Sequence, residues 1–137
     1  MLTKATQAKR VIFVRMSYGD DVLASLREAV KRENIKNAVI LSGFGSVSKY
    51  HFHVVTTGEL PPGEAYPKAD KPMDVVAMSG AIIDGRVHAH ITLTDDAIAM
   101  GGHVEPECIV LTFLIVTIQE VDNALDMTDW DHYRLKI

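Results

Sequence analysis

Three of the chain's six histidines lie in the stretch "GRVHAHITLTDDAIAMGGHV", residues 85–104. His88 and His90 are separated by a single residue, and His103 follows two glycines. Imidazole is a common ligand of divalent metal ions, and three protein ligands with one open position are typical of catalytic or ligand-binding zinc sites. The spacing therefore predicts a divalent metal site, with zinc as the first candidate, formed by His88, His90 and His103.

The first two of these histidines fall in a predicted β-strand, residues 86–94. Its apolar residues point one way, because side chains alternate along a strand, and they complete a face that suits the core. His88 and His90 share the opposite, polar face, where residues two apart have Cα atoms about 6.5–7 Å apart. Imidazoles at that spacing can converge on one metal ion, whose Zn–N bonds would be about 2.0–2.1 Å.

The third histidine must reach this pair from a later part of the chain. Asp95 and Asp96 are expected to open a loop after the strand. Gly101 and Gly102 then allow the backbone to turn sharply and to approach its neighbours closely. In this interpretation the loop delivers His103 beside the pair.

Other interpretations of these residues remain open. The three histidines could be exposed or hydrogen-bonded side chains on a sheet face, with no metal bound. A structural zinc site would more often use several cysteines, and this chain has only Cys108. Cys108 begins an apolar stretch, and we interpret it as a small buried hydrophobic residue rather than a nucleophile.

A second pair, His51 and His53 in "KYHFHVV", also shares one predicted strand face. It could join the same site if the two strands are neighbours, but we favour a half-exposed face that happens to carry histidine. Glu105 follows His103 closely and could be a fourth ligand, a general base or a group that orients a ligand. Whether His53 or Glu105 completes the site is left open. Two further polar residues are interpreted as solvated surface groups: Glu107 and His132.

The elements that position these side chains are mostly predicted strands. Residues rich in β-branched and aromatic types, or alternating in polarity, indicate strands at residues 10–17, 37–42, 47–56, 73–83, 86–94 and 108–119. "SGFGS", residues 42–46, is interpreted as a glycine turn, and Asp84-Gly85 as a hairpin turn. Residues 57–72 contain four of the five prolines and are predicted to form a long loop.

One helix is clear in the sequence. Asp20 and Asp21 suit its start by capping and by interaction with the helix dipole, and apolar residues then recur with helical period. Asn34 suits its end, because asparagine tolerates the left-handed conformation. Strands joined by tight turns, with a helix on one face, predict an α+β fold with a mainly antiparallel sheet in a single compact domain, residues 1–137.

Composition narrows the classes of function. The chain has a net charge of −4, whereas a general nucleic-acid binder usually carries a basic surplus, because contacts to phosphate dominate its affinity. The longest apolar run, "CIVLTFLIVTI", has 11 residues, against the roughly 20 that a membrane helix needs. The first ten residues lack the apolar core of a signal peptide. These features predict a soluble, cytoplasmic protein with no membrane partner.

Three segments carry a family resemblance: "YGDDVLASLREAVKRENIKNAVILSGFGSV", "MDVVAMSGAI" and "VHAHITLTDDAIAMGGHV". Their order resembles the plants-and-prokaryotes-conserved (PPC) domain, over a core of about residues 11–120. The resemblance implies an antiparallel sheet flanked by helices, a homotrimer, and the DNA-binding label that stand-alone prokaryotic members often carry. It also implies that His88, His90 and His103 are the positions that hold zinc in members with three histidines.

The chain departs from the family pattern at three places. Leu114 stands at about the position where the family often has a glutamate, and "MTDWDHYRL" stands where an arginine often precedes an acidic residue. If those groups belong to the family's site, this chain uses a different ligand or has an altered activity. The Arg-Gly-Arg-Pro core of the AT hook is absent, so the minor-groove contact of the plant proteins does not carry over.

Three hypotheses follow. The first is a homotrimeric protein whose three-histidine metal site binds or transforms an unidentified small molecule, as a hydrolase, a lyase or a metabolite sensor. The second is a DNA-binding or regulatory protein without an AT hook. The third is an assembly module that trimerises, with the apolar stretch 108–118 serving both core and subunit contact. We favour the first.

Overall fold

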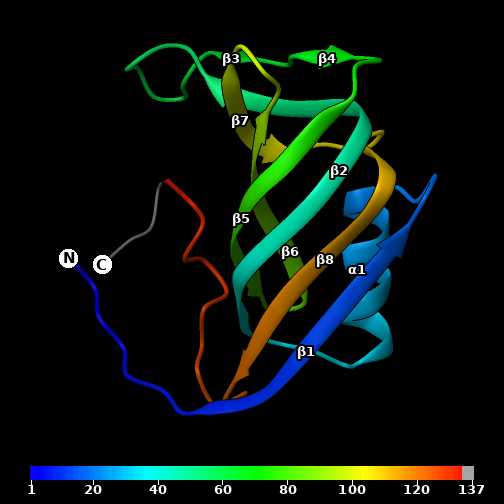
Figure 1. Ribbon diagram of the computed structural model, residues 1–137. Helices are drawn as coiled ribbons and strands as arrows, with labels where there is room; N and C mark the ends of the chain where they lie inside the picture. The colour runs from blue at the N-terminus through cyan, green and yellow to red at the C-terminus, as the bar shows by residue number, and fades with distance from the viewer. Residues whose placement is uncertain (134–137) are drawn as a thin grey trace.

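The computed structural model describes residues 1–133 and shows a mostly antiparallel sheet with one helix (Figure 1). The elements follow in the order β1 (Ala8–Ser17), α1 (Val22–Arg32), β2 (Ala38–Val55), β3 (Glu64–Ala65), β4 (Lys68–Ala69), β5 (Met73–Ile83), β6 (Arg86–Thr94), β7 (Ala99–Val104) and β8 (Ile109–Val121). The strand order across the sheet is β1-β8-β2-β5-β6-β7, and the short strands β3 and β4 pair with β2.

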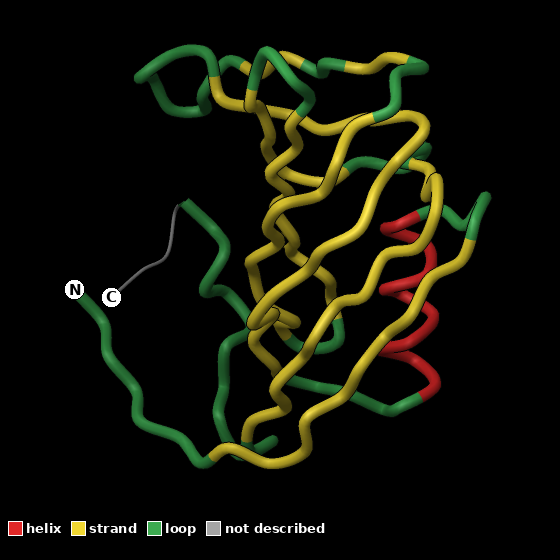
Figure 2. The backbone as a smooth tube through the Cα atoms, in the orientation of Figure 1, coloured by secondary structure: helices red, strands yellow, loops and turns green. Residues whose placement is uncertain are grey.

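The sheet closes on itself through its longest strand. The first part of β2 pairs with β5, whereas its last part pairs with β7, so that Phe52 lies opposite Val104 and His53 opposite His103. Strands β2, β5, β6 and β7 therefore form a closed ring, in which β6 and β7 lie behind β2 and β5 in the view shared by Figure 1 and Figure 2. This closure places β7, which carries His103, between the two strands that carry histidine pairs, β2 and β6.

The glycine turn expected at residues 42–46 is wrong, because β2 runs through it as one strand of 18 residues. A Cβ on Gly45 would lie 2.0 Å from the carbonyl oxygen of Phe113, and one on Gly43 would lie 2.7 Å from the Cβ of Met78. These glycines therefore permit close packing of neighbouring strands rather than a turn. Shifts in register on both sides of them let the long strand bend.

Helix α1 begins as expected. The Asp21 carboxylate accepts a hydrogen bond of 2.8 Å from the amide of Ala24, and Asn34 has a φ of 54° just after the helix. The expected flanking by several helices is wrong, since α1 is the one helix within residues 1–133; it contacts β1 and β6. No helix in this part of the chain is long and apolar enough to cross a membrane.

The core lies between α1 and the sheet, and it includes one face of β6. Ala89, Ile91 and Leu93 are buried there, as the alternation of the sequence predicted, which leaves the histidines on the opposite face. The hairpin before β6 is confirmed, with φ angles of 49° at Asp84 and 76° at Gly85. Residues 57–72 form a loop that carries the short strands β3 and β4.

Candidate metal centre

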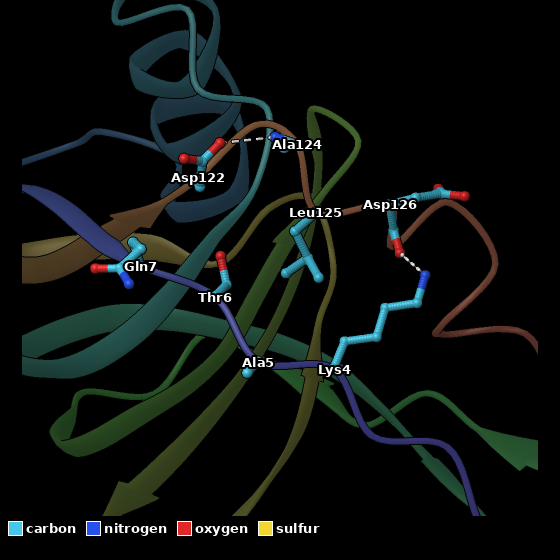
Figure 3. Close-up of a pocket in the computed structure, with 8 residues that line it drawn as sticks. All are labelled: Lys4, Ala5, Thr6, Gln7, Asp122, Ala124, Leu125 and Asp126. Atoms are coloured by element: carbon cyan, nitrogen blue, oxygen red, sulfur yellow. Dashed lines mark hydrogen bonds between the residues drawn. The ribbon is translucent and has the colours of Figure 1, made fainter.

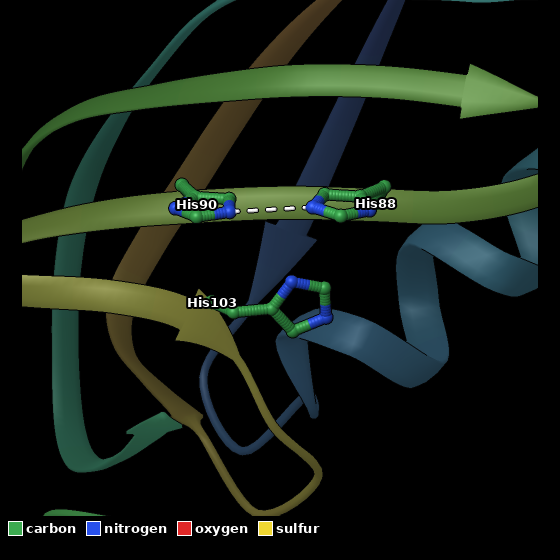
Figure 4. Close-up of side chains that lie close together, drawn as sticks. All are labelled: His88, His90 and His103. Carbon is green, nitrogen blue, oxygen red and sulfur yellow. Dashed lines mark hydrogen bonds between the residues drawn. The ribbon is translucent and has the colours of Figure 1, made fainter. Parts of the chain in front are cut away.

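The three predicted ligands lie together on the outer face of β6 and β7 (Figure 4). His88 and His90 project from the same strand, and His103 is the direct register partner of His90 on the neighbouring strand. The Nε2 atoms of His88 and His90 are 3.4 Å apart, and the ligand atoms that the three residues offer all lie within 4.8 Å of one another. The sequence spacing thus identified a true side-chain cluster.

The cluster fits a divalent ion such as zinc. In a tetrahedral site with Zn–N bonds of about 2.0–2.1 Å, two ligand nitrogens are about 3.4 Å apart, which matches the separation of the His88 and His90 nitrogens. Burial, followed by the charge of His88, lowers the pKa of His103 to about 4, and burial also lowers the pKa of His90. Both rings are therefore neutral at pH 7, the state in which imidazole binds a metal.

His103 reaches the cluster on a strand and not on a loop. Gly101 and Gly102, expected to make a sharp turn, lie within β7. A Cβ on Gly101 would lie 1.9 Å from the Ile91 carbonyl oxygen, and one on Gly102 would lie 2.3 Å from that of His53. The two glycines thus let β7 fit between β6 and β2, and the close approach was expected correctly although the turn was not.

The segment after β8 returns to the cluster and supplies a carboxylate. Asp131 Oδ2 lies 3.3 Å from His88 Nδ1, and Asp131 Oδ1 lies 3.2 Å from a guanidinium nitrogen of Arg86, which also donates to the carbonyl of Thr128 at 2.8 Å. Partial burial alone would raise the pKa of Asp131, but the hydrogen bond from His88 and the charge of Arg86 outweigh it and lower the pKa. An ionised carboxylate can only accept hydrogen bonds, so His88 carries its proton on Nδ1. The lone pair of its Nε2 is then available to a metal ion.

Sequence reasoning missed Asp131. Its segment has no strand or helix periodicity, and the only cue was a run of acidic residues in "MTDWD". Leu114, noted above as a departure from the family pattern, is fully buried in the core. The carboxylate beside His88 is supplied by the irregular segment after β8.

The second histidine pair lies next to the first, because β2 and β7 are neighbours. His53 stacks on His103 with ring centroids 4.5 Å apart, and its Nδ1 lies 2.5 Å from Glu105 Oε1. His53, His103 and Glu105 make a second group able to hold an ion. His51 is directed elsewhere, since its Nδ1 lies 2.7 Å from the carbonyl oxygen of Pro106.

Two other residues considered from the sequence, Glu107 and Cys108, lie outside the cluster. Glu107 is exposed as expected, but its carboxylate pairs with Lys68 and Lys49, which lower its pKa to about 2. Cys108 is fully buried, and that burial raises the pKa of its thiol to about 11. The interpretation of Cys108 as a buried hydrophobic residue is consistent with this position.

Two hollows are relevant to ligand binding. A pocket of about 390 Å³ adjoins the cluster and is lined by Arg27, Arg86, His88, His103 and Asp131 among others. A larger one, of about 520 Å³, lies between the N-terminal segment and the segment after β8 (Figure 3). It contains no histidine, and its Lys4 ammonium is engaged with the carbonyl oxygen of Asp126 at 2.8 Å. We therefore place the candidate site in the smaller pocket, where the ligand-type side chains are.

Residues 3–122 match the Plants and Prokaryotes Conserved (PCC) domain, also abbreviated PPC. The chain belongs to this family. Two curated proteins, both bifunctional protein GlmU from strains of Synechococcus sp., are 26% identical to it. The alignment with the JA-3-3Ab protein covers 78% of this chain but 16% of the relative, so the chain spans about one sixth of that protein's length.

Solved structures share the fold. A metal-containing protein from Archaeoglobus fulgidus has a TM-score of 0.76 and 18% identity, covering 89% of this chain and 86% of its own. A plant- and prokaryote-conserved protein from Pyrococcus horikoshii has a TM-score of 0.74 and 20% identity, covering 90% and 86%. A candidate DNA-binding protein from Ralstonia eutropha JMP134 has a TM-score of 0.66 and 25% identity, covering 81% and 77%.

Proposed function

We propose that this PPC-domain protein holds a divalent ion, zinc in the first instance, on His88, His90 and His103, and binds or transforms a small molecule there. The observation that carries the proposal is the 3.4 Å separation of the His88 and His90 nitrogens, with His103 beside them. The structural relative from Archaeoglobus fulgidus, which is described as containing metal, supports it. When bound, zinc would polarise a carbonyl or lower the pKa of a bound water to about 7.

The chain's own residues supply the rest of such a site. Asp131 accepts from His88 Nδ1 and so fixes the orientation of that ring and the nitrogen that faces inward. The pairing of β6 with β7 sets His90 opposite His103, so two ligands are positioned by backbone hydrogen bonds rather than by a mobile loop. The pocket of about 390 Å³ gives a small molecule access to the His88 and His103 side of the cluster.

Metal content tests the proposal. Untagged protein is incubated with zinc, desalted and assayed by mass spectrometry, alongside the variants His88→Ala and His103→Ala. We expect about one zinc per chain, lost in both variants. His51→Ala is the matched control, because His51 belongs to neither group of possible ligands and its Nδ1 is directed to the Pro106 carbonyl oxygen. Unchanged zinc content in both cluster variants would sink the proposal.

We also propose that the chain forms a homotrimer through the open face of β1, β8 and β2. Phe13 is 70% exposed and Phe44 is 51% exposed, and Phe44 packs edge-on against Phe113 with ring centroids 6.1 Å apart. Contiguous exposed apolar surface of this kind marks protein interfaces. Light scattering should give a trimer mass for the wild type and a lower mass for Phe13→Asp. Val55→Asp should remain trimeric, because this exposed valine is the last residue of β2 and pairs with β3, away from β1 and β8. A monomeric wild type would refute the trimer.

DNA binding is the second candidate function, supported by the relative from Ralstonia eutropha. The net charge of −4 opposes it, and two of the lysines, Lys49 and Lys68, are already paired with Glu107. If DNA is bound through phosphates, affinity must fall steeply between low and moderate salt. The absence of any mobility shift at low salt would remove this candidate.

A further inference from the structure

The pocket beside the histidine cluster is lined by histidine side chains from the sheet and by an arginine from the helix. His88 and His103 form one wall, and Arg27 projects into the lining from α1. Leu26, the preceding residue, is fully buried, so the backbone of the helix at Arg27 is held firmly against the core. Packing therefore fixes the backbone of Arg27 beside the pocket, and the Arg27 side chain itself is exposed.

Three formally charged side chains line the pocket, and two of them neutralise each other. Arg86 and Asp131 are 3.2 Å apart between nitrogen and oxygen, and the second oxygen of Asp131 lies 3.3 Å from His88 Nδ1. The Arg27 guanidinium, in contrast, has no ion pair or hydrogen bond with any other residue in the described range, 1–133. The pocket consequently retains one unpaired positive charge next to two imidazoles.

We infer that this pocket binds a small carboxylate, with Arg27 holding the carboxylate group while another part of the same molecule faces His88 and His103. A guanidinium presents a planar fork that matches a carboxylate with two parallel hydrogen bonds. One unpaired guanidinium suits one carboxylate group, and the second carboxylate of a dicarboxylate such as succinate would face the ion proposed at His88 and His103. The inference names the ligand class of the site proposed above and rests on that proposal for the ion, but the role of Arg27 depends on the pocket alone.

Calorimetry tests this inference with succinate and its uncharged counterpart succinamide, titrated into zinc-loaded and metal-free protein. We expect succinate to bind and succinamide not to bind, and Arg27→Gln to weaken succinate binding at least about tenfold. Arg32→Gln is the matched control, because Arg32 lies on the same helix, pairs with Glu33 at 3.8 Å and lines a different hollow against β1. It should bind succinate as the wild type does.

The zinc content of each sample separates the two proposals. Zinc-loaded Arg27→Gln that binds succinate as tightly as the wild type overturns the inference and leaves the metal site intact. Succinamide or inorganic phosphate binding more tightly than succinate overturns the carboxylate class. If the wild type takes up no zinc, the metal proposal fails and the metal-free titration decides: succinate binding that depends on Arg27 supports the inference, and its absence overturns it.

Discussion

Two histidine pairs with the same one-residue spacing lie on the two strands that flank β7, and their ring nitrogens meet different partners. On β6, the Nε2 atoms of His88 and His90 face each other across 3.4 Å, with His103 beside them. On β2, the Nδ1 of His51 is directed to a backbone carbonyl and that of His53 to the Glu105 carboxylate.

The difference teaches that two histidines on one strand face do not converge by that spacing alone. Both pairs satisfy the requirement of sharing a strand face. Only the β6 pair keeps two nitrogens convergent, because Asp131 engages the far nitrogen of His88 and turns the near one toward His90. The β2 pair uses its nitrogens to fasten residues 105 and 106 to the strand.

The largest expected effect comes from removing each pair in turn. His88→Ala/His90→Ala should lose bound zinc entirely, because two of three ligands are gone, whereas His51→Ala/His53→Ala should retain about one zinc per chain. Mass spectrometry after desalting measures both. Equal loss of zinc in the two double variants would contradict the difference between the β6 and β2 pairs, provided circular dichroism shows that both variants are folded.

A smaller effect is expected from the carboxylate behind the β6 pair. Asp131→Ala should keep the metal but weaken its affinity about 10–100-fold, because His88 loses the partner that fixes its orientation. Competition with a chelator measures the affinity. Asp129→Ala is the control from the same segment, since Asp129 is exposed and contacts His132 at 3.4 Å. Affinity unchanged in Asp131→Ala would show that strand pairing alone orients His88.

Local patterns predicted the elements that carry the cluster. The alternation of polar and apolar residues in β6 identified its core face. The start of the helix, its end and the hairpin were predicted from Asp21, Asn34 and Asp84 respectively, because each of these residues acts through its own backbone conformation or on a nearby amide. These features depend on residues close in sequence, which is why sequence reasoning reached them.

Long-range contacts were beyond that reasoning. Gly43 and Gly101 were assigned to turns, although both lie within strands and permit close contact with a neighbouring strand. Glycine suits either role, and only the neighbouring strand decides between them. Asp131 could not be placed because its position depends on Arg86, 45 residues away in sequence.

The metal-free protein should lose stability in acid. His103, and to a lesser extent His90, resist protonation in the folded state, whereas in the unfolded chain their pKa returns to about 6.5. The unfolded state therefore binds more protons between pH 6.5 and about 4, and the free energy of unfolding falls as the pH decreases through that window. For His103 the shift corresponds to an upper bound of about 3 kcal/mol in the free energy of unfolding. The actual loss is smaller than this bound, because the ring is partly exposed and solvent screens its charge.

Urea denaturation of chelator-treated protein across this window measures the effect. His103→Gln should flatten the dependence on pH, while His51→Gln, which changes a histidine outside the cluster, should leave it steep. A wild-type stability that is constant from pH 6.5 to 4 would show that the rings of the cluster protonate without cost.

The smallest expected effect is at Glu105, and it decides which of two overlapping groups holds the ion. His103 belongs both to the cluster with His88 and His90 and to the group with His53 and Glu105. If the ion lies with the β6 pair, Glu105 only orients His53, and Glu105→Gln keeps an oxygen that can accept from His53 Nδ1. Zinc affinity should then change less than about threefold by chelator competition, well below the Asp131→Ala effect. A loss as large as that of Asp131→Ala would instead indicate that the ion lies closer to β2. Glu105 would then be a ligand, and His103 would be the ligand shared by the two groups.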